Sequence, residues 1–147
     1  MDSYLTFKIG KEAFAANIKS VIEIINVPEI TELPNSDAHV LGVINHRGKV
    51  LVVIDAKVKF NIQSNLKKDN PCIIILETMI GDKNHEMGIM VDIADSVLEL
   101  SENEILPPPN IGASIKEDMI SGVINRNNEF IMILNIDNVF TKEFKIK

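Results

Sequence analysis

Several residue types are scarce in this 147-residue chain, and each scarcity excludes a class of protein. Cys72 is the one cysteine, so the chain forms no internal disulfide and lacks the ligands of a multi-cysteine zinc site. Tryptophan is absent and aromatic residues make up 5%, which argues against base-stacking surfaces. The longest aliphatic or aromatic runs, such as 50–54 and 130–134, have five residues and are too short to span a membrane.

The composition that remains is typical of a soluble globular protein. Hydrophobic residues make up 46% and charged residues 24%, which is too apolar for a disordered chain. A formal net charge of −6 disfavours nucleic acid as a partner. The first residues, MDSYLTF, have neither the basic nor the apolar region of a signal peptide. We therefore expect a cytoplasmic protein with no direct membrane insertion.

A tetrapeptide, GVIN, occurs twice, at 42–45 and 122–125. The match extends without a gap over residues 42–60 and 122–140. Each copy has an apolar start, a polar turn, an apolar run of five residues, one polar residue and a closing phenylalanine. This pattern is typical of a β-hairpin and predicts two copies of one β-rich unit.

The turn residues of the two copies indicate the same backbone geometry. Asn45 and Gly48 fit a type I turn followed by a residue at positive φ, which is a three-residue loop with a bulge. Asn128 stands in the place of Gly48 in the second copy, and asparagine tolerates positive φ better than other non-glycine residues. We expect both hairpins to turn in the same way.

Further strand patterns precede each hairpin. Residues 21–34 resemble residues 97–109, and each segment follows a pair of apolar runs that suggests another hairpin. Short helical turns are expected at 36–40 and 135–140. Many short strands and few helices predict an all-β fold, and closure into two small barrels would remove exposed strand edges.

The expected domain organisation follows from the repeat. A chain of 147 residues fits one domain made of two packed halves. We place the first β-barrel subdomain at about 1–65 and the second at 66–147, with the polar segment 61–70 as the linker.

Catalytic and metal-binding patterns are scarce. The sequence has no Gly-rich phosphate loop, no G-x-S-x-G elbow and no H-E-x-x-H helix. His39, His46 and His85 fall at no metal-ligand spacing, so we expect no metal and no cofactor.

Three acidic residues, Asp92, Asp95 and Glu99, are close in sequence and have the side chains that acid and base catalysis needs. Their alternation with apolar residues is more typical of a solvated strand face. A small hydrolase built on these three residues is one alternative hypothesis, and the chain is otherwise expected not to be an enzyme.

Glu23 and Arg47 are the strongest candidates for a functional pair. Glu23 lies within VIEII, where an ionised carboxylate needs a cationic partner, and Arg47 is a planar donor in the first hairpin turn. Arg47 as a merely solvated turn residue is equally compatible with the sequence. Glu99 is expected in the place of Glu23 in the second copy, but Arg47 is replaced there by Asn127, with Arg126 one position earlier.

Motifs along the chain carry a resemblance to a known family. They are YLTFKIGKEAFAANIKSVIEII, ITELP, VLGVINHRG, VLVVID and KF, followed by MGIMVDIADSVLEL, ILPPP and ISGVIN. The most specific is the G-V-I-N-x-R-G turn followed by an aliphatic strand that ends in Asp55. Over nearly its whole length the chain resembles the CheW family of bacterial chemotaxis coupling proteins.

The resemblance implies one CheW-like domain over 1–147, with two five-stranded SH3-like β-barrels packed side by side. It also implies a non-catalytic scaffold in chemotaxis signal transduction. The implied partners are the regulatory domain of the histidine kinase CheA and the cytoplasmic tip of a chemoreceptor, in receptor arrays at the inner face of the membrane. The alternative is a small β-barrel module that binds oligonucleotides.

The resemblance also implies site residues. By position, Arg47 and Glu23 match the paired charges of the family, and Val21, Gly42 and Asn45 match positions of its receptor-binding surface. The chain departs from the family pattern at His46, Leu51, Val52, Ala56 and Lys57.

Overall fold

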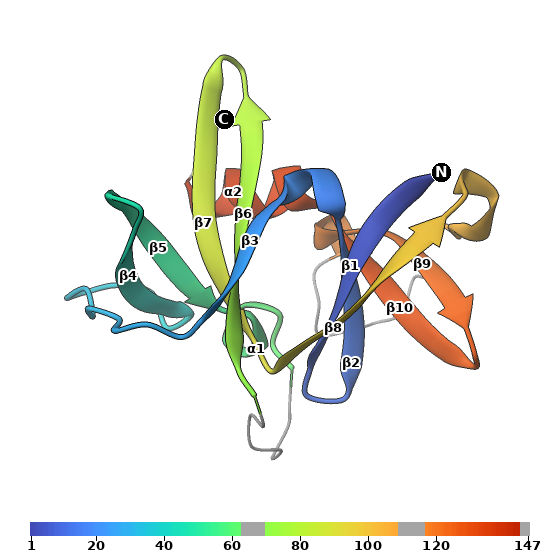
Figure 1. The fold of residues 1–147 in the computed structure, drawn as a ribbon, viewed down its shortest axis with the longest axis horizontal. Helices are drawn as coiled ribbons and strands as arrows, with labels where there is room; N and C mark the ends of the chain where they lie inside the picture. Colours follow the sequence, from blue (N-terminus) through green and yellow to red (C-terminus); the bar gives the residue numbers. More distant parts are fainter. Residues whose placement is uncertain (63–69, 109–116, 145–147) are drawn as a thin grey trace.

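The computed structural model describes residues 1–62, 70–108 and 117–144. In these ranges the chain forms mostly strands, in two five-stranded sheets that lie side by side (Figure 1). The predicted all-β fold with two five-stranded subdomains is confirmed. No helix in the same ranges has the length and apolar character needed to cross a membrane.

The two sheets have matching strand orders. Sheet A has the order β8-β1-β2-β10-β9, and sheet B has the order β3-β6-β7-β5-β4. In each sheet one inner pair is parallel, β2 with β10 and β5 with β7, and the other pairs are antiparallel. Sheet A contains β1 (Asp2–Ile9), β2 (Glu12–Asn17), β8 (Ile93–Leu100), β9 (Ile120–Arg126) and β10 (Glu129–Leu134). Sheet B contains β3 (Val21–Asn26), β4 (Val40–His46), β5 (Lys49–Asp55), β6 (Cys72–Ile80) and β7 (Lys83–Val91).

Each sheet takes its strands from both copies of the repeat. The first copy contributes the hairpin β1-β2 to sheet A and strands β3, β4 and β5 to sheet B. The second copy contributes the hairpin β6-β7 to sheet B and strands β8, β9 and β10 to sheet A. The expected halves, 1–65 and 66–147, therefore do not correspond to the two sheets, because the chain crosses between sheets after β2 and after β7. The expected boundary at residue 65 and most of the expected linker lie outside the described residues.

Strand pairing within residues 1–62, 70–108 and 117–144 does not close the predicted barrels. Each strand order begins and ends at an edge strand. A single bridge covers one edge of each sheet, between Thr31 and Val43 in sheet B and between Leu106 and Val123 in sheet A. Each bridge carries two backbone hydrogen bonds of 2.8–2.9 Å. The chain thus covers these edges with a connecting segment in place of a continuous strand ladder.

The glycine of each GVIN copy permits this close crossing. A Cβ on Gly42 would lie 2.1 Å from the carbonyl oxygen of Thr31, and Gly42 has a φ of 147°. A Cβ on Gly122 would lie 2.5 Å from Cγ2 of Ile105 and 3.0 Å from the carbonyl oxygen of Leu106. Residues with a side chain do not fit at either position without movement of the connecting segment.

The hairpin turns are tighter than expected. His46 pairs with Lys49, and Arg126 pairs with Glu129, so each loop has two residues. Both loop residues have positive φ: 53° and 82° at Arg47 and Gly48, and 55° and 63° at Asn127 and Asn128. Positive φ at both central positions is the requirement of a type I′ turn, which matches the twist of paired strands better than the predicted three-residue loop does. The expectation that the two copies turn alike is confirmed.

A short helix follows each hairpin. The predicted helix at 135–140 is present as α2 (Ile136–Glu143), capped by the Asn135 side chain, which accepts from the backbone N–H of Asn138. Its counterpart α1 (Ala56–Lys59) is capped in the same way by Asp55. The helical turn expected at 36–40 does not form a helix: a 3.0 Å hydrogen bond from the Val40 N–H to the Asp37 carbonyl oxygen closes one turn at 38–39, and Val40 begins β4. Three 3-10 turns complete the fold: Ile18–Ser20, Glu102–Glu104 and Glu117–Met119.

The hydrophobic core has one shared cluster and one cluster inside each sheet. Alternate residues of β6 separate the clusters: Ile74 and Leu76 belong to the shared cluster, whereas Ile73 and Ile75 belong to sheet B. The shared cluster draws on both sheets and both helices, including the closing phenylalanines Phe60 and Phe140, which are fully buried. The inner cluster of sheet A contains Tyr4, Ala13, Ala15, Leu100, Ile124, Ile131 and Ile133.

Candidate functional site

The structure brings the predicted pair together at one end of sheet B. Arg47 Nη2 lies 3.0 Å from Glu23 Oε1, and His46 Nε2 lies 3.2 Å from the same oxygen. The N–H directions miss hydrogen-bond geometry at this buried oxygen, so the attraction is mainly electrostatic. Because β3 and β4 are the two edge strands, these contacts link opposite edges of the sheet. We call the charged cluster at this end site B: Glu23, His46, Arg47, Lys49, Glu77 and Glu86.

Arg47 occupies an unusual backbone position. Its φ of 53° is in the left-handed region, which costs roughly 1–2 kcal/mol for a residue other than glycine or asparagine. Its side chain is 75% exposed, and an ion pair with such exposure contributes only about 0–1 kcal/mol. The pair with Glu23 therefore at most offsets the backbone strain, and stability alone does not explain an arginine at this position.

The other three predicted residues have different structural positions. Asn45 is exposed, and its side-chain oxygen accepts a hydrogen bond of 3.1 Å from the backbone N–H of Gly48, which fixes the turn. Val21 is partly buried against the shared core cluster. Gly42 is buried beneath the crossing segment, so it supports the surface without presenting a side chain.

A surface groove of about 460 Å³ runs beside the turn on the outer face of the hairpin. Asn45 and Val50, which pair across the hairpin, line one side of it. Val50 is 72% exposed, so its aliphatic side chain is accessible beside the groove. The remaining lining residues are Pro28, Glu29, Thr31, Val43 and Ile44.

The sequence analysis missed a second ion pair in site B. Glu77 and Glu86 face each other across β6 and β7, which is unfavourable for two carboxylates. Lys49 Nζ lies 2.7 Å from Glu86 Oε2 and offsets this repulsion. The hydrogen bond and charge of Glu86, and then the charge of Glu77, raise the pKa of Lys49. The feature of the sequence that could have indicated these contacts is the length of the β6-β7 hairpin, because its strands extend well past the rest of sheet B (Figure 1).

The corresponding end of sheet A differs. Arg126 Nη2 lies 3.0 Å from Glu104 Oε2, and so does not replace Arg47 as a partner of Glu99. Hydrogen bonds from the Ser101 backbone and from Arg126 lower the pKa of Glu104. Asn127 is exposed in the turn.

The expectation that Glu99 takes the place of Glu23 is wrong. Glu23 pairs with Ile75, whereas Glu99 pairs with Ser3, which is three positions before Thr6. Thr6 corresponds to Ile75, and Ser96 is hydrogen-bonded to Thr6 through its backbone N–H (3.0 Å), its carbonyl oxygen (2.9 Å) and its hydroxyl (3.1 Å), so Ser96 takes the place of Glu23. The strand pairings align Val21 with Ala94, whereas the sequence match aligns Val21 with Val97. This equivalence follows from residues that pair across three neighbouring strands. In sheet B they are Val53, Gly88 and Ile75, and in sheet A they are Ile133, Ala15 and Thr6.

The three acidic residues of the hydrolase hypothesis occupy different environments. Asp92 is buried where the chain crosses from β7 to β8; its Oδ2 accepts a 2.7 Å hydrogen bond from the Gly10 backbone and lies 3.9 Å from Lys57 Nζ. Asp95 and Glu99 are exposed on β8. The position of Asp92 favours a structural role, in joining the two sheets.

The histidines and the cysteine also have structural contacts. His39 Nε2 lies 2.6 Å from Glu143 Oε1, and the ring of His85 packs against Phe144 at 5.2 Å between centroids. Cys72 is buried, and burial raises the pKa of its thiol, which disfavours the reactive thiolate.

Comparison with known proteins identifies the family. The model of the CheW-like domain matches residues 3–144. The chemotaxis protein CheW of Rhizobium meliloti (strain 1021) is 30% identical over 139 residues, which cover 95% of this chain and 87% of that protein. The chemotaxis protein CheW of Thermotoga maritima is 29% identical, with 97% and 89% covered. A crystal structure of the scaffolding protein TtCheW from Thermoanaerobacter tengcongensis superposes with a TM-score of 0.82 at 30% identity, over 92% of this chain and 84% of that one. The chain belongs to the CheW-like domain family.

Proposed function

We propose that this protein is a non-catalytic adaptor that couples chemoreceptors to the histidine kinase CheA in chemotaxis signalling. Family membership supports this proposal, together with the names of similar proteins: chemotaxis proteins and a scaffolding protein. In this function the protein binds the cytoplasmic tip of a receptor and the regulatory domain of the kinase, at the inner face of the membrane.

The single observation that carries the proposal is the arginine in the first turn. Arg47 has a strained backbone conformation, and its ion pair at most offsets that strain. Strain of this kind is characteristic of functional positions. Asn127 fills the same position in the second copy with no such conflict. We infer that Arg47 is present for a partner, and that the receptor binds on the site B side of the first turn.

The proposed receptor-binding surface has the mixed character of a transient interface. Arg47 and Asn45 are exposed polar groups, and Val50 and the groove beside it supply apolar area. Interfaces of this kind bury roughly 800 Å² per partner or less and dissociate readily. An adaptor held at two surfaces gains effective concentration, so modest affinities are enough to build an array.

The experiment that tests this function measures binding of the purified protein to a receptor-tip fragment and to the kinase regulatory domain. Arg47→Asn places the residue of the second turn in the first, and asparagine adopts positive φ readily. We expect Arg47→Asn to weaken receptor binding at least tenfold, to leave kinase binding within about twofold, and to change stability by less than about 1 kcal/mol.

The matched control is Asn127→Arg, which adds the same charge at the equivalent turn of sheet A. It should leave receptor binding unchanged. Failure of the wild-type protein to bind either fragment would refute the proposed function, and equal receptor binding by wild type and Arg47→Asn would refute the role of Arg47.

A further inference from the structure

Site B has a counterpart at the equivalent end of sheet A, which we call site A: Lys8, Ser96, Arg126, Asn127 and Glu129. Residues of the two sites correspond through the strand pairings. Arg126 takes the place of His46, Asn127 takes the place of Arg47, and Ser96 takes the place of Glu23.

The two sites use opposite charges at two further positions. Glu129 stands where sheet B has Lys49, and Lys8 stands where it has Glu77. Lys8 Nζ lies 3.7 Å from Glu129 Oε1. Lys49 pairs with Glu86, and the counterpart of Glu86 in sheet A is Ala13, so each site holds an ion pair between the hairpin and a neighbouring strand but at different positions. The two sites therefore share a design, in which facing charges hold the hairpin turn against the neighbouring strands.

The sites differ most where Glu23 is replaced. In site B the Glu23 carboxylate occupies the space between β3 and the turn, in contact with His46 and Arg47. In site A the much smaller side chain of Ser96 leaves a cavity of about 120 Å³. Lys8, Asp95, Ser96, Arg126, Asn127 and Glu129 contribute to its lining. The volume is large enough for the end of one acidic side chain.

We propose that this cavity in site A is a docking site for an acidic side chain of a partner protein. In site B, the Glu23 carboxylate fills the position that the cavity occupies in site A, so this arrangement of strands and turn accommodates a carboxylate. Arg126 stands where His46 contacts that carboxylate, and the Asn127 amide stands where the arginine does. The hydrogen bond from Arg126 to Glu104 uses Nη2, and a guanidinium carries five N–H donors, so Arg126 has donors for a second carboxylate. Of the two acidic residues in the lining, Glu129 is already paired with Lys8, and Asp95 is exposed one residue before Ser96.

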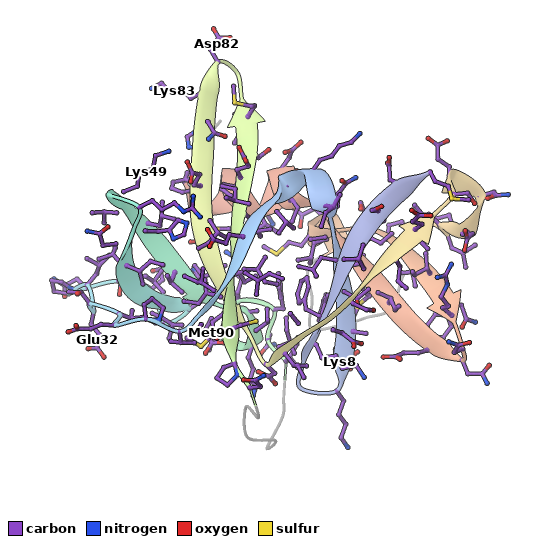
Figure 2. All side chains as sticks on the ribbon, viewed as in Figure 1. Lys8, Glu32, Lys49, Asp82, Lys83 and Met90 are labelled. Carbon is purple, nitrogen blue, oxygen red and sulfur yellow. The ribbon has the colours of Figure 1, made fainter. Side chains whose placement is uncertain are left out.

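The direction of the two sites indicates which partner supplies the acid. The β4-β5 turn of site B points to the upper left in Figure 1, and the β9-β10 turn of site A points to the lower right. In Figure 2, Lys49 lies at the upper left, beside the β4-β5 hairpin, and Lys8 lies below the centre, beside the β1-β2 hairpin. A partner bound at site A is therefore separate from the one at site B. Resting on the proposed function, which assigns site B to the receptor, the partner at site A is the kinase regulatory domain.

The first test asks whether the cavity prefers a carboxylate, and it needs no partner. Ser96→Glu supplies the missing acid within the chain, and Ser96→Gln has nearly the same shape without the charge. We expect the Glu variant to melt up to about 3 °C above the Gln variant, with a smaller difference at high salt. In an Arg126→Ala background the difference should vanish. A Glu variant that melts at or below the Gln variant, or an advantage that survives without Arg126, would overturn the proposal.

The second test measures binding of the kinase regulatory domain to the same proteins. Ser96→Glu should weaken binding at least tenfold, because its own carboxylate fills the cavity, and Ser96→Gln should weaken it less. Receptor-tip binding should not change. Normal kinase binding by Ser96→Glu would refute docking at this cavity while leaving the proposed function intact. If the wild-type protein binds neither fragment, the proposed function fails, and the melting series still decides the chemical preference of the cavity.

Discussion

The two hairpin turns of this molecule share a backbone and differ in chemistry. Arg47 and Gly48 form the first turn, Asn127 and Asn128 form the second, and all four residues have positive φ. The second turn uses residues that suit this conformation, whereas the first places an arginine there. The comparison separates what the fold requires, which is positive φ, from what a partner requires, which we infer to be the guanidinium group.

The sites around the two turns differ in a similar way. Site B is filled by its own ion pairs, with Glu23 between two basic residues. Site A has the ion pair of Lys8 with Glu129 and a cavity where Glu23 would be. The two copies thus form surfaces of the same architecture with different charges and shapes, and we propose that these surfaces bind different partners.

The largest effect that tests this comparison concerns the repeated glycine. Gly42→Ala should cost about 3 kcal/mol, because the left-handed conformation costs roughly 1–2 and the overlap with the Thr31 carbonyl oxygen roughly 1–3. Gly122→Ala should cost less, roughly 1–3 kcal/mol, because Gly122 is not among the glycines with positive φ, and only the overlap with Ile105 Cγ2 and the Leu106 carbonyl oxygen remains. Urea unfolding measures both values. Equal losses of unfolding free energy in the two variants would contradict this difference between Gly42 and Gly122.

A smaller effect on stability is expected from the ion pairs of Lys49 with Glu86 and of Lys8 with Glu129. The pKa of Lys49 is raised in the folded protein, so its stabilising contribution is complete below the unfolded value near 10.5 and is lost as pH rises through the folded value. Lys49→Gln should therefore melt below wild type at pH 8, and the gap should narrow above pH 10.5. Glu129→Gln, which removes the longer 3.7 Å pair of site A, should melt closer to wild type at pH 8. A gap for Lys49→Gln that persists unchanged above that pH would contradict the role of Lys49.

Local patterns predicted much of this fold. The gapless match of 42–60 with 122–140 predicted two equivalent hairpins, and the replacement of Gly48 by Asn128 predicted a shared positive φ. The pair formed by Glu23 and Arg47 followed from one carboxylate in an apolar strand and one arginine in a turn. These inferences depend on interactions that are short in sequence or on simple charge complementarity.

The features that were missed depend on pairing between distant strands. The exchange of hairpins β1-β2 and β6-β7 is not encoded in the order of the repeats, because either sheet offers the same partner edges to each hairpin. The true counterpart of Glu23 was missed because the sequence match aligned Val21 with Val97, whereas the pairings with distant strands align Val21 with Ala94 and so make Ser96, not Glu99, the counterpart of Glu23. Helix α1 has four residues, too few for a periodic pattern.

The most direct test of the central claim is the hydrogen-exchange footprint of a receptor-tip fragment on the wild-type protein. The claim is that site B binds the receptor and that site A does not. Slower exchange should appear in β3 and around the Arg47 turn, with no change around the Asn127 turn. Protection around Asn127, with none around Arg47, would contradict it.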